Sequence, residues 1–112
     1  MKKVNISELV LEDAHGGELK KKVLVAKKDI DNKHLMFVNE AYIDTGKEMS
    51  SHLHDDMEEV FYFLSGEGEM SVGEETTKIK AGDRIIAPAK QSQWIKNTGK
   101  TTLKYICLGI KL

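Results

Sequence analysis

Short apolar segments separated by turn residues make up most of the chain. Apolar and polar side chains alternate in these segments, and β-branched and aromatic residues are frequent, which is typical of strands. The pattern predicts strands at 23–26, 35–43, 49–54, 59–64, 69–72, 76–80, 84–87, 93–97 and 102–110. Glycine-containing segments between them, such as 65–68 and 81–83, predict tight turns.

Only Ile6–Leu11 could begin a helix, with Ser7 as its N-cap. No later stretch has the 3.6-residue period of an amphipathic helix. Short strands at intervals of roughly 8–12 residues predict an all-β sandwich or small barrel. A length of 112 residues allows one domain, which we expect to span residues 1–112.

Charge and cysteine content exclude several classes of protein. The chain has 17 basic and 18 acidic residues and a net charge of −1, so it lacks the basic face of a nucleic-acid binder. The Lys20–Lys22 run is interpreted as the solvated start of a strand rather than as an anion-binding patch. The longest apolar run, Val60–Leu64, is too short to span a membrane. The single cysteine, Cys107, favours a reducing, cytoplasmic location.

A candidate metal site lies near the middle of the chain. His52 and His54 are separated by one residue, so on a strand both imidazoles would point to the same face. Glu59 begins the next predicted strand, and a hairpin would bring its carboxylate back to the imidazoles. Two histidines and a carboxylate are a common donor set for a divalent ion such as Mn, Fe, Ni, Co or Zn.

The residues around this site resemble the first sequence motif of the cupins. In that family the motif is a glycine, five residues, His-x-His, three or four residues, a glutamate, six residues and a glycine. Here Gly46, His52, His54, Glu59 and Gly66 have this spacing. The resemblance implies a jelly-roll barrel, the double-stranded β-helix of small single-domain cupins of the RmlC-like kind. It also implies a barrel core at about residues 34–112 and N-terminal strands or an arm at 1–33.

The second cupin motif is matched in part. It is a glycine, five residues, Pro-x-Gly, two residues, a histidine, three residues and an asparagine. Gly82, Pro88 and Asn97 match it, whereas Lys90 replaces the second glycine and Gln93 replaces the histidine. Lys90 predicts a slightly different loop. Gln93 stands where the resemblance places the fourth metal ligand.

Three interpretations of Gln93 remain open. Its amide oxygen could be a ligand, which would favour harder ions such as Mn or Fe(II). It could instead contact substrate, which would leave His52, His54 and Glu59 as a facial triad with open positions. Alternatively, the site could have lost its metal and become a polar pocket.

Other residues are candidates for the wall of a pocket beside the metal. Strand alternation places Phe61 and Phe63 on the same face as Glu59, and Ile95 on the same face as Gln93. Tyr42 and Tyr105 could reach the cavity with their hydroxyl groups, and His15, which precedes two glycines, could fold over the cavity mouth.

The predicted function is that of a small metal-dependent enzyme that acts on a small polar molecule. The resemblance implies dioxygenase, decarboxylase or isomerase chemistry, without choosing among them. The alternative is a non-catalytic module that binds a metal or a small metabolite. The resemblance further implies a homodimer, and no residue contributes evidence for a nucleic-acid or membrane partner.

Overall fold

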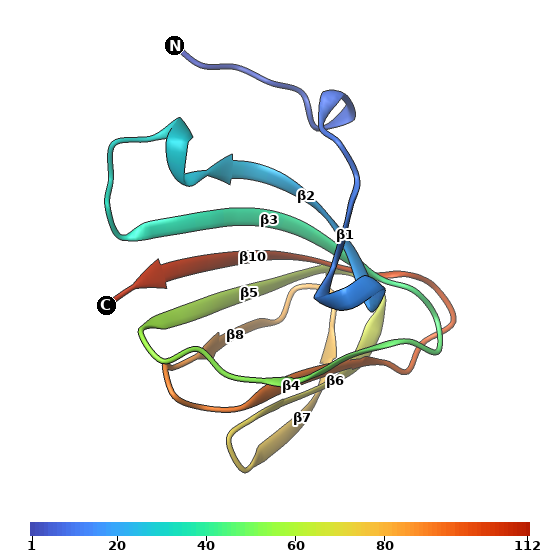
Figure 1. The fold of residues 1–112 in the computed structure, drawn as a ribbon. Helices are drawn as coiled ribbons and strands as arrows, with labels where there is room; N and C mark the ends of the chain where they lie inside the picture. Colours follow the sequence, from blue (N-terminus) through green and yellow to red (C-terminus); the bar gives the residue numbers. More distant parts are fainter.

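The computed structural model describes residues 1–112 as two antiparallel sheets that face each other (Figure 1). Three short 3₁₀ helices, η1 (Ile6–Glu8), η2 (His15–Gly17) and η3 (Lys27–Asp29), all lie in the N-terminal part of the chain. No helix has the length and apolar character needed to cross a membrane. The ten strands are β1 (Glu12–Ala14), β2 (Leu19–Ala26), β3 (Leu35–Ile43), β4 (Glu48–His52), β5 (Met57–Ser65), β6 (Glu67–Val72), β7 (Glu75–Lys80), β8 (Arg84–Ala87), β9 (Gln93–Asn97) and β10 (Leu103–Lys111).

The strand order confirms the predicted jelly roll. One sheet has six strands in the order β1-β2-β3-β10-β5-β8, and the other has four in the order β4-β9-β6-β7. Neighbouring strands are antiparallel, and most are distant in sequence, so the chain crosses repeatedly between the two sheets. The connection from β4 to β5 is one of these crossings, and it carries His54.

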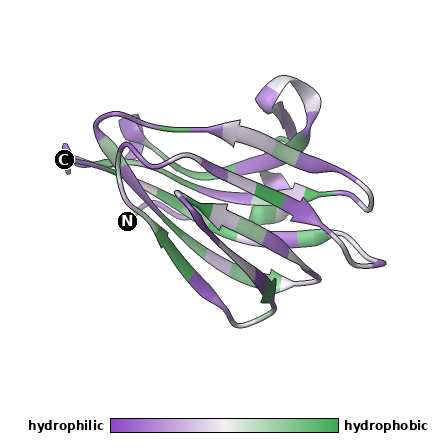
Figure 2. Ribbon diagram, turned by 90° about the horizontal axis from the view of Figure 1, so that it is seen from below, coloured by the Kyte–Doolittle hydropathy of each residue, from purple (hydrophilic) through white to green (hydrophobic).

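The core lies between the two sheets. Apolar and polar residues alternate along the strands, as the colour changes in Figure 2 show. On β5, Phe61 and Phe63 point inward and are 1% and 0% exposed, while the intervening Tyr62 points outward and is 46% exposed. This alternation gives the six-stranded sheet one apolar inner face, and the candidate metal site lies at one end of that face.

The N-terminal part of the chain differs from the sequence-based prediction. The predicted helix is a single 3₁₀ turn, and its cap is Asn5, because the Asn5 side-chain oxygen accepts hydrogen bonds from the backbone N–H and the hydroxyl group of Ser7. Ser7 was therefore the wrong choice of cap. The short edge strand β1, which pairs with β2, was not predicted because only three residues form it.

The strand predicted at 49–54 also ends earlier than expected. β4 stops at His52, so the alternation rule does not orient His54. Lys90, in the loop before β9, has a φ of 67°, the left-handed conformation that favours glycine. Its N–H group donates a 2.7 Å hydrogen bond to the carbonyl oxygen of His54. This bond attaches the residues after β4 to the loop before β9.

Candidate metal centre

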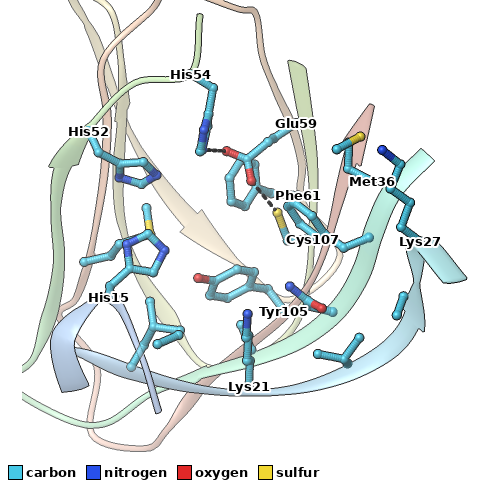
Figure 3. Close-up of a pocket in the computed structure, with 18 residues that line it drawn as sticks. His15, Lys21, Lys27, Met36, His52, His54, Glu59, Phe61, Tyr105 and Cys107 are labelled. Atoms are coloured by element: carbon cyan, nitrogen blue, oxygen red, sulfur yellow. Dashed lines mark hydrogen bonds and ion pairs between the residues drawn. The ribbon is translucent and has the colours of Figure 1, made fainter. Parts of the chain in front are cut away.

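The structure brings together the three residues of the predicted donor set. His52, His54 and Glu59 each offer one potential ligand atom, and these atoms lie within 4.8 Å of one another. Figure 3 shows the two imidazoles and the carboxylate facing a common space at one end of a cavity. The cluster therefore suggests a metal-binding site.

Strand pairing explains this convergence. His52 is the last residue of β4 and lies opposite Gln93 of β9. Glu59 points inward from β5, where its neighbours across the sheet are Ala87 and Gly109. The crossing from β4 to β5 places His54 between the two sheets, with its Nε2 atom 3.0 Å from Glu59 Oε1.

The protonation pattern of His52 suits metal binding. Its Nδ1 atom lies 3.2 Å from the carbonyl oxygen of Ser50, which can only accept a hydrogen bond. This contact places the ring proton on Nδ1 and leaves the lone pair of Nε2 directed toward the cluster. Hydrogen bonding of the distal ring nitrogen to a backbone carbonyl is a frequent way to orient a metal-binding histidine.

Gln93 extends the donor set to four side chains. It is 2% exposed, and its amide nitrogen lies 3.2 Å from His52 Nε2 and contacts Glu59 Oε1. A rotation of the terminal amide by half a turn would direct its oxygen, in place of its nitrogen, toward His52 and Glu59. Two imidazole nitrogens, a carboxylate oxygen and an amide oxygen form a set that fits a divalent ion.

The charge of Glu59 also fits a cation at this point. Glu59 is 6% exposed, and its only ion-pair partner is His54. A buried carboxylate is costly unless a positive charge compensates for it. A divalent ion between Glu59 and the two imidazoles would supply that charge.

Cys107 supports Glu59 from the other side. Its thiol group, on β10, donates a 3.0 Å hydrogen bond to Glu59 Oε2, so the two carboxylate oxygens have different roles. Burial raises the pKa of the Cys107 thiol well above its usual range, and the negative charge of Glu59 adds to this shift. The thiol therefore stays protonated and remains a donor. Nothing in the local sequence indicates this contact, because it depends on the register between β10 and β5.

A cavity of about 390 Å³ adjoins the cluster. Three of the predicted wall residues line it: Phe61, Tyr105, and His15 from η2. The ring centroid of His15 lies 4.7 Å from that of His52. Burial lowers the pKa of His15, and the proximity of the His52 ring lowers it further. Sequence analysis missed Lys21, which also lines the cavity.

The other three predicted wall residues lie elsewhere. Phe63 and Ile95 are both 0% exposed and belong to the packed core. Phe63 is four positions beyond Glu59 on β5, and there the ring of Tyr105, at a centroid distance of 5.4 Å, fills the space. Tyr42 is on the outer face of β3, where its hydroxyl group donates a hydrogen bond to Glu40. Its alternation with the inward-facing Ala41 excludes it from the cavity.

The comparison with known families agrees with the motif and the fold. The family model of the cupin domain matches residues 39–109, which include all four candidate ligands. This chain is a cupin. A predicted oxalate decarboxylase from Thermotoga maritima, known as a crystal structure, superposes on this cupin with a TM-score of 0.90. The two share 27% sequence identity, and the superposition covers 99% of this chain and 100% of that chain.

Two relatives are also similar in sequence. An oxalate-binding protein of Thermotoga maritima is 31% identical over 96 residues, which cover 86% of this cupin and 78% of the relative. An uncharacterised protein of Methanocaldococcus jannaschii is 37% identical over 68 residues, which cover 61% of this cupin. Those residues are 54% of that protein, so this cupin spans about half its length.

Proposed function

We propose that this cupin is a metal-dependent enzyme that binds a small carboxylate such as oxalate and cleaves its carbon–carbon bond. The observation that carries the proposal is the convergence of His52, His54 and Glu59, with Gln93 beside them, at the end of a cavity. The names of the two Thermotoga maritima relatives support oxalate as the first compound to test.

The four side chains would hold the ion and leave its cavity side open to substrate. A bound divalent ion supplies Lewis-acid chemistry, which draws electron density from a carboxylate. Glu59 and Gln93 would offer oxygen atoms, and this favours Mn or Fe(II) over softer ions. Phe61 and the other apolar walls would exclude water from the bound acid.

A non-catalytic role is the second candidate. The name of the 31% identical relative describes binding rather than turnover. In that case the same four side chains would hold a metal and its carboxylate ligand, and the protein would store or sense the acid.

Oxalate titration and product analysis test both candidates. Protein loaded with Mn(II) should bind oxalate, whereas metal-free protein and the Glu59→Gln variant should not. Release of equal amounts of carbon dioxide and formate, with one proton consumed per oxalate, would support the enzyme. Binding without products would support the binding module, and no metal-dependent binding of any small carboxylate would contradict both.

We also propose that the protein is a homodimer. The outer face of the six-stranded sheet carries a continuous apolar row, in which Val38, Leu108, Val60 and Ile86 are neighbours on successive strands. Ile86 is 46% exposed, so a second copy could bury this row. Light scattering at several concentrations tests the dimer. The cytoplasmic location stays a prediction from the lone cysteine.

A further inference from the structure

The cavity beside the candidate metal centre is larger than oxalate requires. Its volume of about 390 Å³ is in the range of sites for organic ligands of considerable size. It reaches from the histidines and Glu59 across β10 and β3 to β2, and 11 of its 18 lining residues are hydrophobic. A two-carbon acid at the metal would leave the part near β2 unfilled.

A lysine lies at this far end. Lys21 is on the inner face of β2, between the inward-facing Leu19 and Val23, and its side chain points into the cavity in Figure 3. It is opposite Ala41 of β3, which in turn is opposite Tyr105 of β10. The small side chain of Ala41 leaves space above it, so the ammonium group of Lys21 and the ring of Tyr105 face the same part of the cavity.

Lys21 has no acidic partner within the chain. The ion pairs of the structure involve His54, Lys96 and Lys104 instead. Its cross-strand neighbour Glu12 is exposed and lies beyond ion-pairing distance. A half-buried ammonium group without a counter-charge in an apolar cavity is well placed to bind an anion.

Of the three consecutive lysines, Lys21 alone lines the cavity. Lys20 is exposed on the outer face of the sheet, and Lys22 donates a hydrogen bond to the carbonyl oxygen of Ile6. The interpretation of the lysine run as a solvated strand start therefore fits Lys20 but is wrong for Lys21.

Two neutral polar side chains line the same cavity as Lys21. Tyr105 is 2% exposed, and burial raises the pKa of its hydroxyl group well above the usual range, so it remains a hydrogen-bond donor. Asn39 is 8% exposed, lines the same cavity, and buries a side-chain oxygen that has no hydrogen-bond partner. A buried amide oxygen without a hydrogen-bond partner is energetically costly. Rotation about its terminal torsion would let this amide pair with a bound molecule.

We infer that Lys21, Tyr105 and Asn39 form a second anion-binding subsite, and that the ligand is therefore a small diacid with a short apolar spacer. One carboxylate would bind at the metal and the other at Lys21, with the spacer against Phe61. Lys27, which also lines the cavity, adds positive charge on the η3 side. The inference rests on the proposed function, and it narrows the small carboxylates considered there to diacids longer than oxalate.

Calorimetric titration of Mn(II)-loaded protein tests the subsite. The probes are succinate and glutarate, with the monoacids butyrate and valerate as length-matched controls. Wild type should bind at least one diacid about tenfold or more tightly than its matched monoacid, because a hydrogen bond to a charged group contributes that much. Lys21→Met should remove the preference, while Lys21→Arg, which keeps the charge, should retain it.

Lys20→Met is the matched control, because it makes the same substitution one residue away on the outer face of the strand. It should bind diacids as wild type does. Equal binding of diacids by wild type and Lys21→Met, with metal present in both, would overturn the subsite and leave the proposed function intact. A wild type that takes up no metal would overturn the proposed function, and the same comparison on the metal-free protein would then decide the subsite.

Discussion

Replacement of Cys107 tests whether the side chain behind Glu59 contributes to metal affinity. The thiol is 6% exposed and donates a 3.0 Å hydrogen bond to Glu59 Oε2, which leaves Oε1 toward the histidines. Cys107→Ala removes the donor. Cys107→Ser keeps a donor of similar size in the same position. The two variants therefore separate the hydrogen bond from the volume of the side chain.

The expected size of the effect follows from this contact. Hydrogen bonds to charged groups contribute about 1.5–3 kcal/mol, and a thiol, as a weak donor, belongs at the lower end. Groups that orient metal ligands typically change affinity by about 10–100-fold when replaced. We expect Cys107→Ala to weaken Mn(II) binding about tenfold and Cys107→Ser to stay within about threefold of wild type.

Competition with a fluorescent chelator measures these dissociation constants. Thermal unfolding of the metal-free proteins provides the control, because loss of a buried sulfur atom in Cys107→Ala should cost about 1 kcal/mol, or about 4 °C in Tm. Equal metal affinity of wild type, Cys107→Ala and Cys107→Ser would refute the reasoning, because the thiol would then not orient Glu59.

Three further predictions concern stability, each measured by urea unfolding. Lys90→Gly should stabilise the protein by about 0.5–1 kcal/mol, because φ at this position is 67° and a left-handed backbone is costly for lysine. An unchanged free energy of unfolding would contradict the left-handed conformation of Lys90. Gly68→Ala should destabilise the protein by at least about 2 kcal/mol, because the new Cβ would lie 2.2 Å from a backbone oxygen of β9. An unchanged stability would contradict this close approach of Gly68 to β9. Burial raises the pKa of Tyr42 from 10.0 to about 12, and the hydrogen bond to Glu40 is the second cause. Ionisation of the Tyr42 hydroxyl group therefore destabilises the folded state. The stabilisation from the protonated Tyr42 hydroxyl group is complete below pH 10 and is lost as the pH rises from about 10 to 12. Between these pH values the free energy of unfolding should therefore fall more for wild type than for Tyr42→Phe.

The sequence contained enough information to predict that the candidate ligand residues converge. His52, Glu59 and Gln93 could be predicted because the motif spacing ties them to strand ends and to alternating inward positions. The same alternation correctly oriented Phe61 and Phe63 toward the core. It could not reveal how far the cavity extends along β5, and so it could not separate Phe61, which lines the cavity, from Phe63, which does not.

Residues that depend on long-range strand register could not be predicted. Cys107 meets Glu59 because β10 lies beside β5, and Lys21 faces Tyr105 only through the intervening β3. A shift of one residue in β2 would turn Lys21 outward and Lys20 inward. The local sequence of three consecutive lysines contains no signal that distinguishes these registers.

We expect His52 and His54 to hold a divalent metal ion. Elemental analysis of untagged protein, purified without chelator, would measure this ion. The His52→Ala/His54→Ala double variant is compared with His34→Ala, which removes an exposed histidine outside the cavity. We expect close to one Mn, Fe, Ni, Co or Zn ion per chain in wild type and in His34→Ala, and none in the double variant. Equal metal content in all three proteins, or none in wild type even after incubation with these ions, would contradict this expectation.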